Sequence, residues 1–174
     1  MTTPKQTTLT FSTSLTLILL FSISLTFAQK ADSKYNFPRS SKTNKIAWEG
    51  KGKVDSLSVE QMATKLISWT SANNYLFSII YGNNDTKIIE IKGKFKYVKG
   101  TGRFTTKELN GTFKINVALE KGGYSFEINN VSMTRYQLDY IYETQPAKES
   151  LNLAYSNIDI EMNKIKNNLM TFYK

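Results

Sequence analysis

Four segments of the 174-residue chain alternate apolar and polar residues with a period of two, the pattern of strands with one buried face. The clearest runs from Thr112 to Glu120. Its apolar side is formed by Phe113, Ile115, Val117 and Leu119. The other three lie at residues 46–54, 89–97 and 124–128. Several strands of this kind predict a sheet that is buried on one face and exposed on the other.

The segments between these strands carry turn and bulge signals. An apolar run at residues 75–81 predicts a further strand, joined to the next by the hairpin loop Gly82–Asp85. Lys121–Gly123 predicts a second turn, whereas residues 99–110 predict a basic, Gly- and Thr-rich loop. The alternation slips at Asn129–Asn130, which indicates a bulge, and the glycines at 50 and 52 indicate close backbone packing or a bulge.

Two helices are predicted. Ser58 and Gln61 form a capping-box pattern that begins a helix over residues 59–72. A second helix, over about residues 149–173, has seven apolar residues at alternating spacings of four and three. They are Leu151, Tyr155, Ile158, Met162, Ile165, Leu169 and Phe172. Such a stripe can lie on the chain's own sheet or form a homodimer. The strand and helix order predicts an α+β domain, an antiparallel sheet of about five strands with its helices on one face.

The first 28 residues have the pattern of a secretory signal peptide. Lys5 is their only charge, and the apolar segment from Leu15 to Phe27 is too short for an ordinary membrane span. We expect cleavage after Ala28, with an uncleaved N-terminal anchor as the alternative. Because no cysteine follows the apolar segment, lipoprotein acylation is excluded.

Cleavage would leave one domain of ordinary size. Residues 29–43 contain Pro38 and many polar residues without an apolar period, which predicts a flexible leader before a single domain at residues 44–174. With no cysteine, that domain must be stabilised by its core alone. The full chain has a net charge of +9, and loss of Lys5 leaves +8, so anionic envelope molecules are more plausible partners for an exported protein than nucleic acid.

The composition excludes several kinds of chemistry. Without histidine or cysteine the chain cannot build Ser-His-Asp or Cys-His catalysis, nor an imidazole or thiolate metal site. A carboxylate pair drawn from Glu49, Glu90 and Glu127 would suit glycoside hydrolysis. All three lie on the predicted polar strand face beside Lys, Asn or Ser, which favours cross-strand pairing instead. We therefore expect a non-enzymatic domain without a cofactor.

A group of basic residues on the polar strand face and the adjoining loop is the remaining candidate site. It comprises Lys92, Lys94, Lys96, Lys114, Lys99, Arg103 and Lys107. These side chains could bind an anion such as lipopolysaccharide phosphate or an acidic glycan. The alternative is that the strand lysines prevent the exposed sheet from adding another chain.

Several segments over residues 46–133 form a recognisable set: Lys53–Asp55, Ala63–Trp69 with Asn73–Asn74, Lys87–Gly93, Gly111–Ile115 and Gly122–Ile128. Together they resemble an exported bacterial family of unknown function with a TBP-like fold. The resemblance implies a curved antiparallel sheet backed by helices, in periplasmic or surface proteins of Gram-negative bacteria. It implies no activity and no catalytic residues, and the nucleic-acid role of the eponymous fold does not transfer.

Overall fold

The computed structural model describes residues 35–101, 105–144 and 149–173. Their elements are, in chain order, β1 (Trp48–Val54), α2 (Val59–Ala72), β2 (Leu76–Gly82), β3 (Thr86–Gly100), β4 (Thr106–Glu120), β5 (Gly122–Met133), β6 (Tyr136–Gln137), α3 (Leu138–Thr144) and α4 (Glu149–Thr171). The predicted α+β order is confirmed, and β6 and α3 are additions in a region where no element was predicted. Among these residues, no helix is long and apolar enough to cross a membrane.

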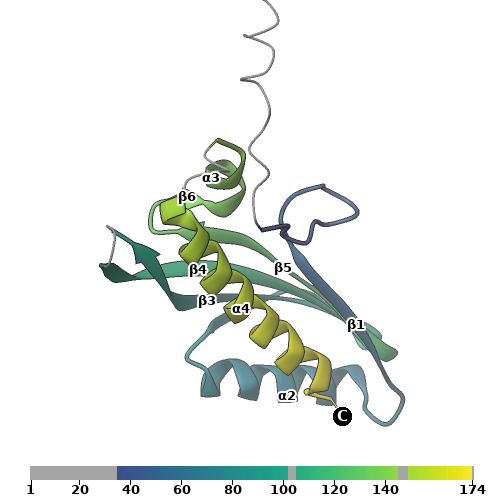
Figure 1. Ribbon diagram of the computed structural model, residues 1–174. Coiled ribbons are helices and arrows are strands. Elements are labelled where there is room, and N and C mark those ends of the chain that lie inside the picture. Colours follow the sequence, from purple (N-terminus) through teal and green to yellow (C-terminus); the bar gives the residue numbers. More distant parts are fainter. Residues whose placement is uncertain (1–34, 102–104, 145–148, 174) are drawn as a thin grey trace, which may run out of the picture. The chain divides into compact units, whose positions relative to one another are not determined.

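The strands form one antiparallel sheet in the order β1-β5-β4-β3-β2, with β6 paired to β5. Alternate residues of each strand point to opposite sides. Helices α2 and α4 pack on one side, the helix face, where Ile91 and Ile115 are buried (Figure 1). The other side, the open face, carries the polar residues of the alternating segments. The predicted one-sided sheet is therefore confirmed.

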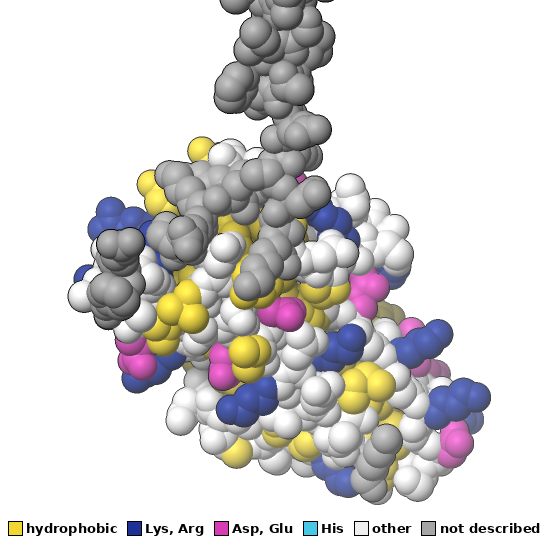
Figure 2. Space-filling model, viewed as in Figure 1, with side chains coloured by type: hydrophobic (Ala, Val, Ile, Leu, Met, Phe, Trp, Pro, Cys, Tyr) yellow, Lys and Arg dark blue, Asp and Glu magenta, His cyan; other side chains and the backbone are white. Residues whose placement is uncertain are grey.

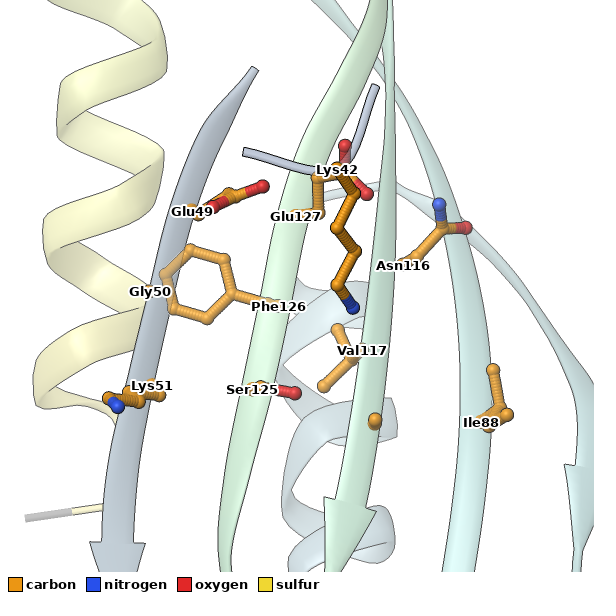
Figure 3. A pocket seen from close by; sticks show the side chains of 11 residues that line it. Lys42, Glu49, Gly50, Lys51, Ile88, Asn116, Val117, Ser125, Phe126 and Glu127 are labelled. Atoms are coloured by element: carbon orange, nitrogen blue, oxygen red, sulfur yellow. The ribbon is translucent and has the colours of Figure 1, made fainter. Parts of the chain in front are cut away.

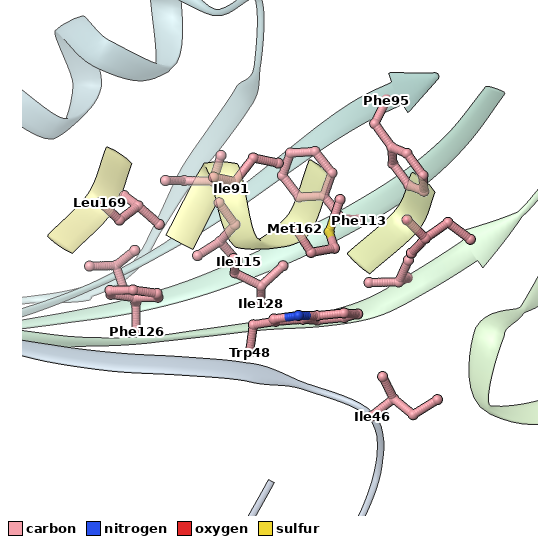
Figure 4. Packing of buried hydrophobic residues seen from close by; sticks show 14 of the residues in the cluster. Ile46, Trp48, Ile91, Phe95, Phe113, Ile115, Phe126, Ile128, Met162 and Leu169 are labelled. Carbon is pink, nitrogen blue, oxygen red and sulfur yellow. The ribbon is translucent and has the colours of Figure 1, made fainter. Parts of the chain in front are cut away.

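Helix α4 lies across the helix face and closes the core. Six of the seven stripe residues, Leu151, Tyr155, Ile158, Met162, Ile165 and Leu169, are buried, and Phe172 is partly buried. Met162 and Leu169 lie over Trp48, Phe113 and Phe126 of the sheet (Figure 4). The stripe is therefore covered by the chain's own sheet, and a homodimer through this stripe is contradicted.

The capping box predicted for α2 is present. Ser58 Oγ accepts a 3.2 Å hydrogen bond from the Gln61 amide, and Gln61 Oε1 accepts a 2.8 Å bond from the Ser58 amide. Two backbone N–H groups at the helix start are thus paired by local side chains.

The glycines of β1 allow aromatic rings to lie against its backbone. A Cβ at Gly50 would overlap the ring of Phe126, and one at Gly52 would lie 2.5 Å from Tyr124 Cε1. The Tyr124 hydroxyl donates a 3.0 Å hydrogen bond to the Leu169 carbonyl. Close packing, and not a bulge, therefore explains these glycines, since the β1–β5 register is continuous.

The predicted bulge in β5 is confirmed. Lys114 faces Asn129 and Thr112 faces Ser132, so two residues of β5 oppose one residue of β4. Asn130 at the bulge has a φ of 48°. The slip restores Val131 and Met133 to the buried side.

The predicted basic loop at residues 99–110 is wrong in extent. Strand β3 continues to Gly100 and β4 begins at Thr106, with Gly100 opposite Thr106. Backbone pairing between two long neighbouring strands continues although the residues at this end lack a strict alternation.

The predicted flexible leader is also corrected at its end. Phe37 is buried and makes edge-to-face contacts with Trp48 and Tyr155, at ring-centroid distances of 5.8 and 5.6 Å. The Pro38 carbonyl accepts a 3.0 Å hydrogen bond from the Ala47 amide. One aromatic residue therefore anchors a segment whose composition suggested no packing. The predicted signal peptide lies outside the described residues.

Candidate functional site

A row of polar residues crosses the open face of the sheet. Glu49 of β1 faces Glu127 of β5, Glu127 faces Asn116 of β4, and Asn116 faces Glu90 of β3. The three carboxylates predicted on the polar face therefore share one row. Directly opposed residues have Cβ atoms about 5 Å apart, so Glu49 and Glu127 are neighbours. Glu90 lies two strands from Glu127, about 10 Å away.

The Glu49–Glu127 pair borders a shallow pocket on the open face (Figure 3). The pocket has a volume of about 520 Å³ and also contains Lys42, Lys51 and Asn116. Lys42 reaches over the strands from the segment before β1, as Figure 3 shows. Neither Glu49 nor Glu127 forms an ion pair with another described residue. Like charges directly opposed across two strands are destabilising.

Four of the predicted basic residues lie on the open face, and three of them bind carboxylates. Glu90 accepts from Lys92 at 3.0 Å and from Lys114 at 3.1 Å. Hydrogen bonds from Lys92 and then from Lys114 hold the pKa of the Glu90 carboxyl below its usual value. Lys96 binds Glu108 at 2.8 Å, which raises the pKa of Lys96. Of the four lysines, Lys94 alone has no ion pair with a described residue.

The open face is consequently a network of ion pairs, within β3 and between β3 and β4, and not a concentrated positive patch. The opposite side of the molecule has a similar mixture. In Figure 2, lysine and arginine side chains lie beside acidic side chains, and no large area has one sign of charge. A mixed surface of this kind suits strand lysines that protect a sheet from adding another chain.

Two of the other predicted basic residues, Lys99 and Lys107, do not adjoin this face. Lys99 and Lys107 are direct register partners on β3 and β4. Lys99 is two residues beyond the buried Tyr97, so both lysines are on the helix face. The prediction that all seven cations gather in one place is therefore wrong for Lys99 and Lys107, because the strands continue where a loop was expected. Arg103 lies outside the described residues.

Lys99 instead borders a cavity at the end of the helix face, which we call the Lys99 cavity. Its volume is about 330 Å³. It is lined by Tyr97, Lys99, Leu109, Met133, Thr134, Arg135, Tyr136, Ile141 and Leu151. Four of these side chains are aliphatic or thioether groups, two are tyrosines, two are cations and none is a carboxylate. The lining is thus apolar with positive charge, which suits the two parts of an amphiphilic anion.

The strands and α3 together position the cavity. Tyr97 and Leu109 are register partners on β3 and β4, two residues along each strand from the Lys99–Lys107 pair. The Tyr97 hydroxyl and Thr134 Oγ1 lie 2.9 Å apart and fix the turn that carries Arg135. Thr134 has a φ of 60°, an uncommon value for a β-branched residue, in the turn between β5 and β6.

Sequence reasoning missed Arg135, Tyr136 and the apolar wall of this cavity. Arg135 and Tyr136 lie in a stretch for which the sequence predicted neither an element nor a site. The available signal was the concentration of tyrosines at 136, 140 and 142 beside an arginine, a composition common at binding surfaces. No group of three or more acidic side chains that could hold a metal ion occurs in the described ranges.

Comparison with known proteins gives a relationship in fold. No protein-family model matches the chain, and no curated protein matches it. A crystal structure of a DUF4468 family protein from Bacteroides ovatus aligns with a TM-score of 0.56 and 13% identity, covering 79% of this chain and 90% of that one. A TBP-like protein from Parabacteroides distasonis aligns with a TM-score of 0.57 and 10% identity, covering 78% and 96%.

These two neighbours agree with the resemblance drawn from residues 46–133. At such identities a structural likeness shows the fold alone, and neither neighbour's description assigns a function. The chain therefore has the TBP-like α+β fold found in this DUF4468 protein and this TBP-like protein.

Proposed function

We propose that this protein is an exported, non-enzymatic binding module that holds an anionic amphiphile in the Lys99 cavity. The observation that carries the proposal is the lining of that cavity, in which Lys99 and Arg135 accompany aliphatic side chains and no described lining residue is a carboxylate. A ligand with an apolar portion and a phosphate or carboxylate head would satisfy both kinds of lining group.

The charge arrangement beside the cavity supports an anion as the ligand. Lys99 and Lys107 face each other across two strands and have no ion pair with a described residue. Directly opposed like charges repel. An anionic head group near them would remove that repulsion, whereas a cationic one would increase it.

The open face supports anion binding less well. Lys92 and Lys114 share the carboxylate of Glu90, and Lys96 binds Glu108. An anion there would have to compete with these carboxylates for Lys92, Lys96 and Lys114, which reduces the net binding free energy. The helix face therefore suits an anionic ligand better than the open face does.

Binding of dodecyl phosphate to the purified protein tests the proposal. We expect Lys99→Gln and Arg135→Gln each to raise the dissociation constant about tenfold or more, because a hydrogen bond to a charged group contributes about 1.5–3 kcal/mol. Lys94→Gln is the matched control, since Lys94 is unpaired among the described residues but lies on the open face opposite Thr112. It should leave the affinity unchanged.

Two further probes separate the parts of the ligand. Inorganic phosphate should bind much more weakly than dodecyl phosphate if the apolar wall contributes, and the uncharged dodecyl maltoside should show no dependence on Lys99 or Arg135. Calorimetry at two salt concentrations measures the electrostatic part. Equal affinities of wild type, Lys99→Gln and Arg135→Gln would contradict the proposal, as would an equal loss in Lys94→Gln.

The export and the lack of catalysis are proposals with tests of their own. Protein recovered from an envelope fraction should begin at Gln29, and a retained Met1 would show that the apolar segment is an anchor. Glu49 and Glu127 form the closest candidate carboxylate pair, so Glu127→Gln is the variant that would expose a glycosidase activity. We expect no glycan hydrolysis by the wild type, and hydrolysis that Glu127→Gln abolishes would refute a non-enzymatic role.

A further inference from the structure

Strand β2 is an edge of the sheet with apolar residues on both of its sides. All seven of its residues are exposed, with Leu76 at 74% and Ile80 at 62% exposure. Its one partner strand among the described residues is β3, so one edge of its backbone faces away from the sheet. Exposed apolar edge strands are templates for pairing with another strand.

The opposite edge of the sheet is protected in the usual ways. Strand β1 carries Glu49, Lys51 and Lys53 among its seven residues, and the segment before it is hydrogen-bonded through the Pro38 carbonyl to the Ala47 amide. Strand β2, with the sequence Leu-Phe-Ser-Ile-Ile-Tyr-Gly, contains neither a charge nor a proline. Its bulge leaves Ile80 without a register partner on β3. A bulge is itself one of the features that hinder strand addition, so β2 has this one feature but lacks the charges and the covering segment that protect β1.

We propose that β2 pairs antiparallel with β2 of a second copy of this chain, which joins the two sheets into one. A two-fold axis places the same strand against itself, so the apolar side chains of one copy meet those of the other. Phe77 and Ile79 share the helix-face side of β2, while Leu76 and Tyr81 share the open-face side, as their β3 partners show. Apolar contact is thus available on both sides of the joined strands.

Charge favours a second copy at this edge over contact elsewhere on the domain. The chain has a net charge of +9, so two copies repel each other at most surfaces. The uncharged strand is the place where they approach with least repulsion. Its exposed side chains and the adjoining Ile88 supply a few hundred Å² of apolar area per copy, the size of a functional surface patch. Such an area suits a weak, concentration-dependent dimer rather than an obligate one.

Cysteine cross-linking of the full chain tests the register directly, because the natural sequence has no cysteine. Ser78→Cys, Ile79→Cys and Ile80→Cys are oxidised separately, with Lys51→Cys on β1 as the control. A disulfide needs Cα atoms about 4.4–6.8 Å apart. At the position nearest the two-fold axis, the cysteines of the two copies lie opposite each other. We therefore expect disulfide dimers to form there at least about tenfold faster than with Lys51→Cys.

A matched pair of lysine substitutions measures how much the exposed edge of β2 contributes to dimerisation. Ile80 is 62% exposed on β2 and Ile160 is 61% exposed on α4, so Ile80→Lys and Ile160→Lys alter the surface equally. In sedimentation equilibrium, Ile80→Lys should weaken dimerisation about tenfold or more and Ile160→Lys should leave it unchanged. A monomeric wild type, oligomers that grow beyond two, equal effects of both substitutions, or cross-linking no faster on β2 than at Lys51→Cys would each overturn the proposal.

Discussion

The indole Nε1 of Trp48 donates a 3.1 Å hydrogen bond to Oδ1 of Asp159, which ties edge strand β1 to helix α4. Trp48 is fully buried, and the same carboxylate oxygen accepts a 2.9 Å bond from Asn163 Nδ2. A buried indole N–H without an acceptor is costly. Asp159 thus satisfies the polar atom of the largest side chain in the core.

Asp159→Ala should lower the free energy of unfolding by about 1–3 kcal/mol, because it leaves the Trp48 N–H unpaired. Asp159→Asn keeps an oxygen acceptor and should lose clearly less. Urea denaturation of the two variants and the wild type measures the difference. Equal stabilities of Asp159→Ala and Asp159→Asn would show that the hydrogen bond contributes nothing.

Gly50→Ala should destabilise the protein by about 1–3 kcal/mol, since its Cβ would overlap the ring of Phe126. The double variant Gly50→Ala/Phe126→Leu should be more stable than the sum of its two single variants predicts, because the ring is no longer in the way. Gly82→Ala is the control, as its nearest contact would be Lys87 Cγ at 3.4 Å. Thermal unfolding of the four variants gives the coupling, and strict additivity would contradict the steric explanation.

The ion pairs of Glu90 should produce an acid-sensitive contribution to stability. The folded-state pKa of Glu90 lies below the reference value of 4.5, with Lys92 as the first cause and Lys114 as the second. A carboxyl group with a lowered pKa stabilises the fold above pH 4.5. This contribution to stability is lost as the pH falls through the folded-state pKa. Glu90→Gln should therefore have a lower melting temperature than the wild type at pH 7, and this difference should shrink in acid. Glu120→Gln, which alters an exposed residue, should show no such convergence.

The buried hydroxyl of Tyr155 has no hydrogen-bond partner in the described part of the chain. Tyr155→Phe should therefore be as stable as the wild type or more stable, by up to about 1 kcal/mol. Tyr124→Phe is the contrasting variant, because it removes the bond to the Leu169 carbonyl and should lose about 0.5–1.5 kcal/mol. Denaturation at neutral pH ranks the three proteins, and a large loss in Tyr155→Phe would contradict an unpaired hydroxyl.

Alkaline unfolding gives a second readout for the same residue. Burial, followed by the neighbouring Tyr142, raises the pKa of Tyr155 from 10.0 to about 12. A raised pKa contributes stability that is complete below pH 10 and is lost as the pH rises through 12. The advantage of Tyr155→Phe over the wild type should consequently increase above pH 10. A constant difference across this range would contradict the raised pKa.

The strand faces and helix starts could be predicted because they depend on near neighbours in the sequence. Phe113 and Ile115 share a face through the two-residue period of a strand, and Ser58 and Gln61 lie within one helical turn. The bulge at Asn130 was predictable for the same reason, since it shifts a local alternation. The apolar stripe from Leu151 to Leu169 was equally predictable, but the period of a helix does not determine which surface covers the stripe.

By itself, the sequence determined the α+β class, the sides of the strands, and the absence of histidine and cysteine chemistry. The tertiary structure decided which residues meet. Strand pairing placed Glu127 beside Glu49, continued β3 until Lys99 faced Lys107, and brought Arg135 to the same cavity. Packing likewise buried Phe37 from an otherwise polar segment. Local periodicity fixes the direction of a side chain, whereas its neighbours depend on strand order and register, which arise from contacts between residues far apart in the chain.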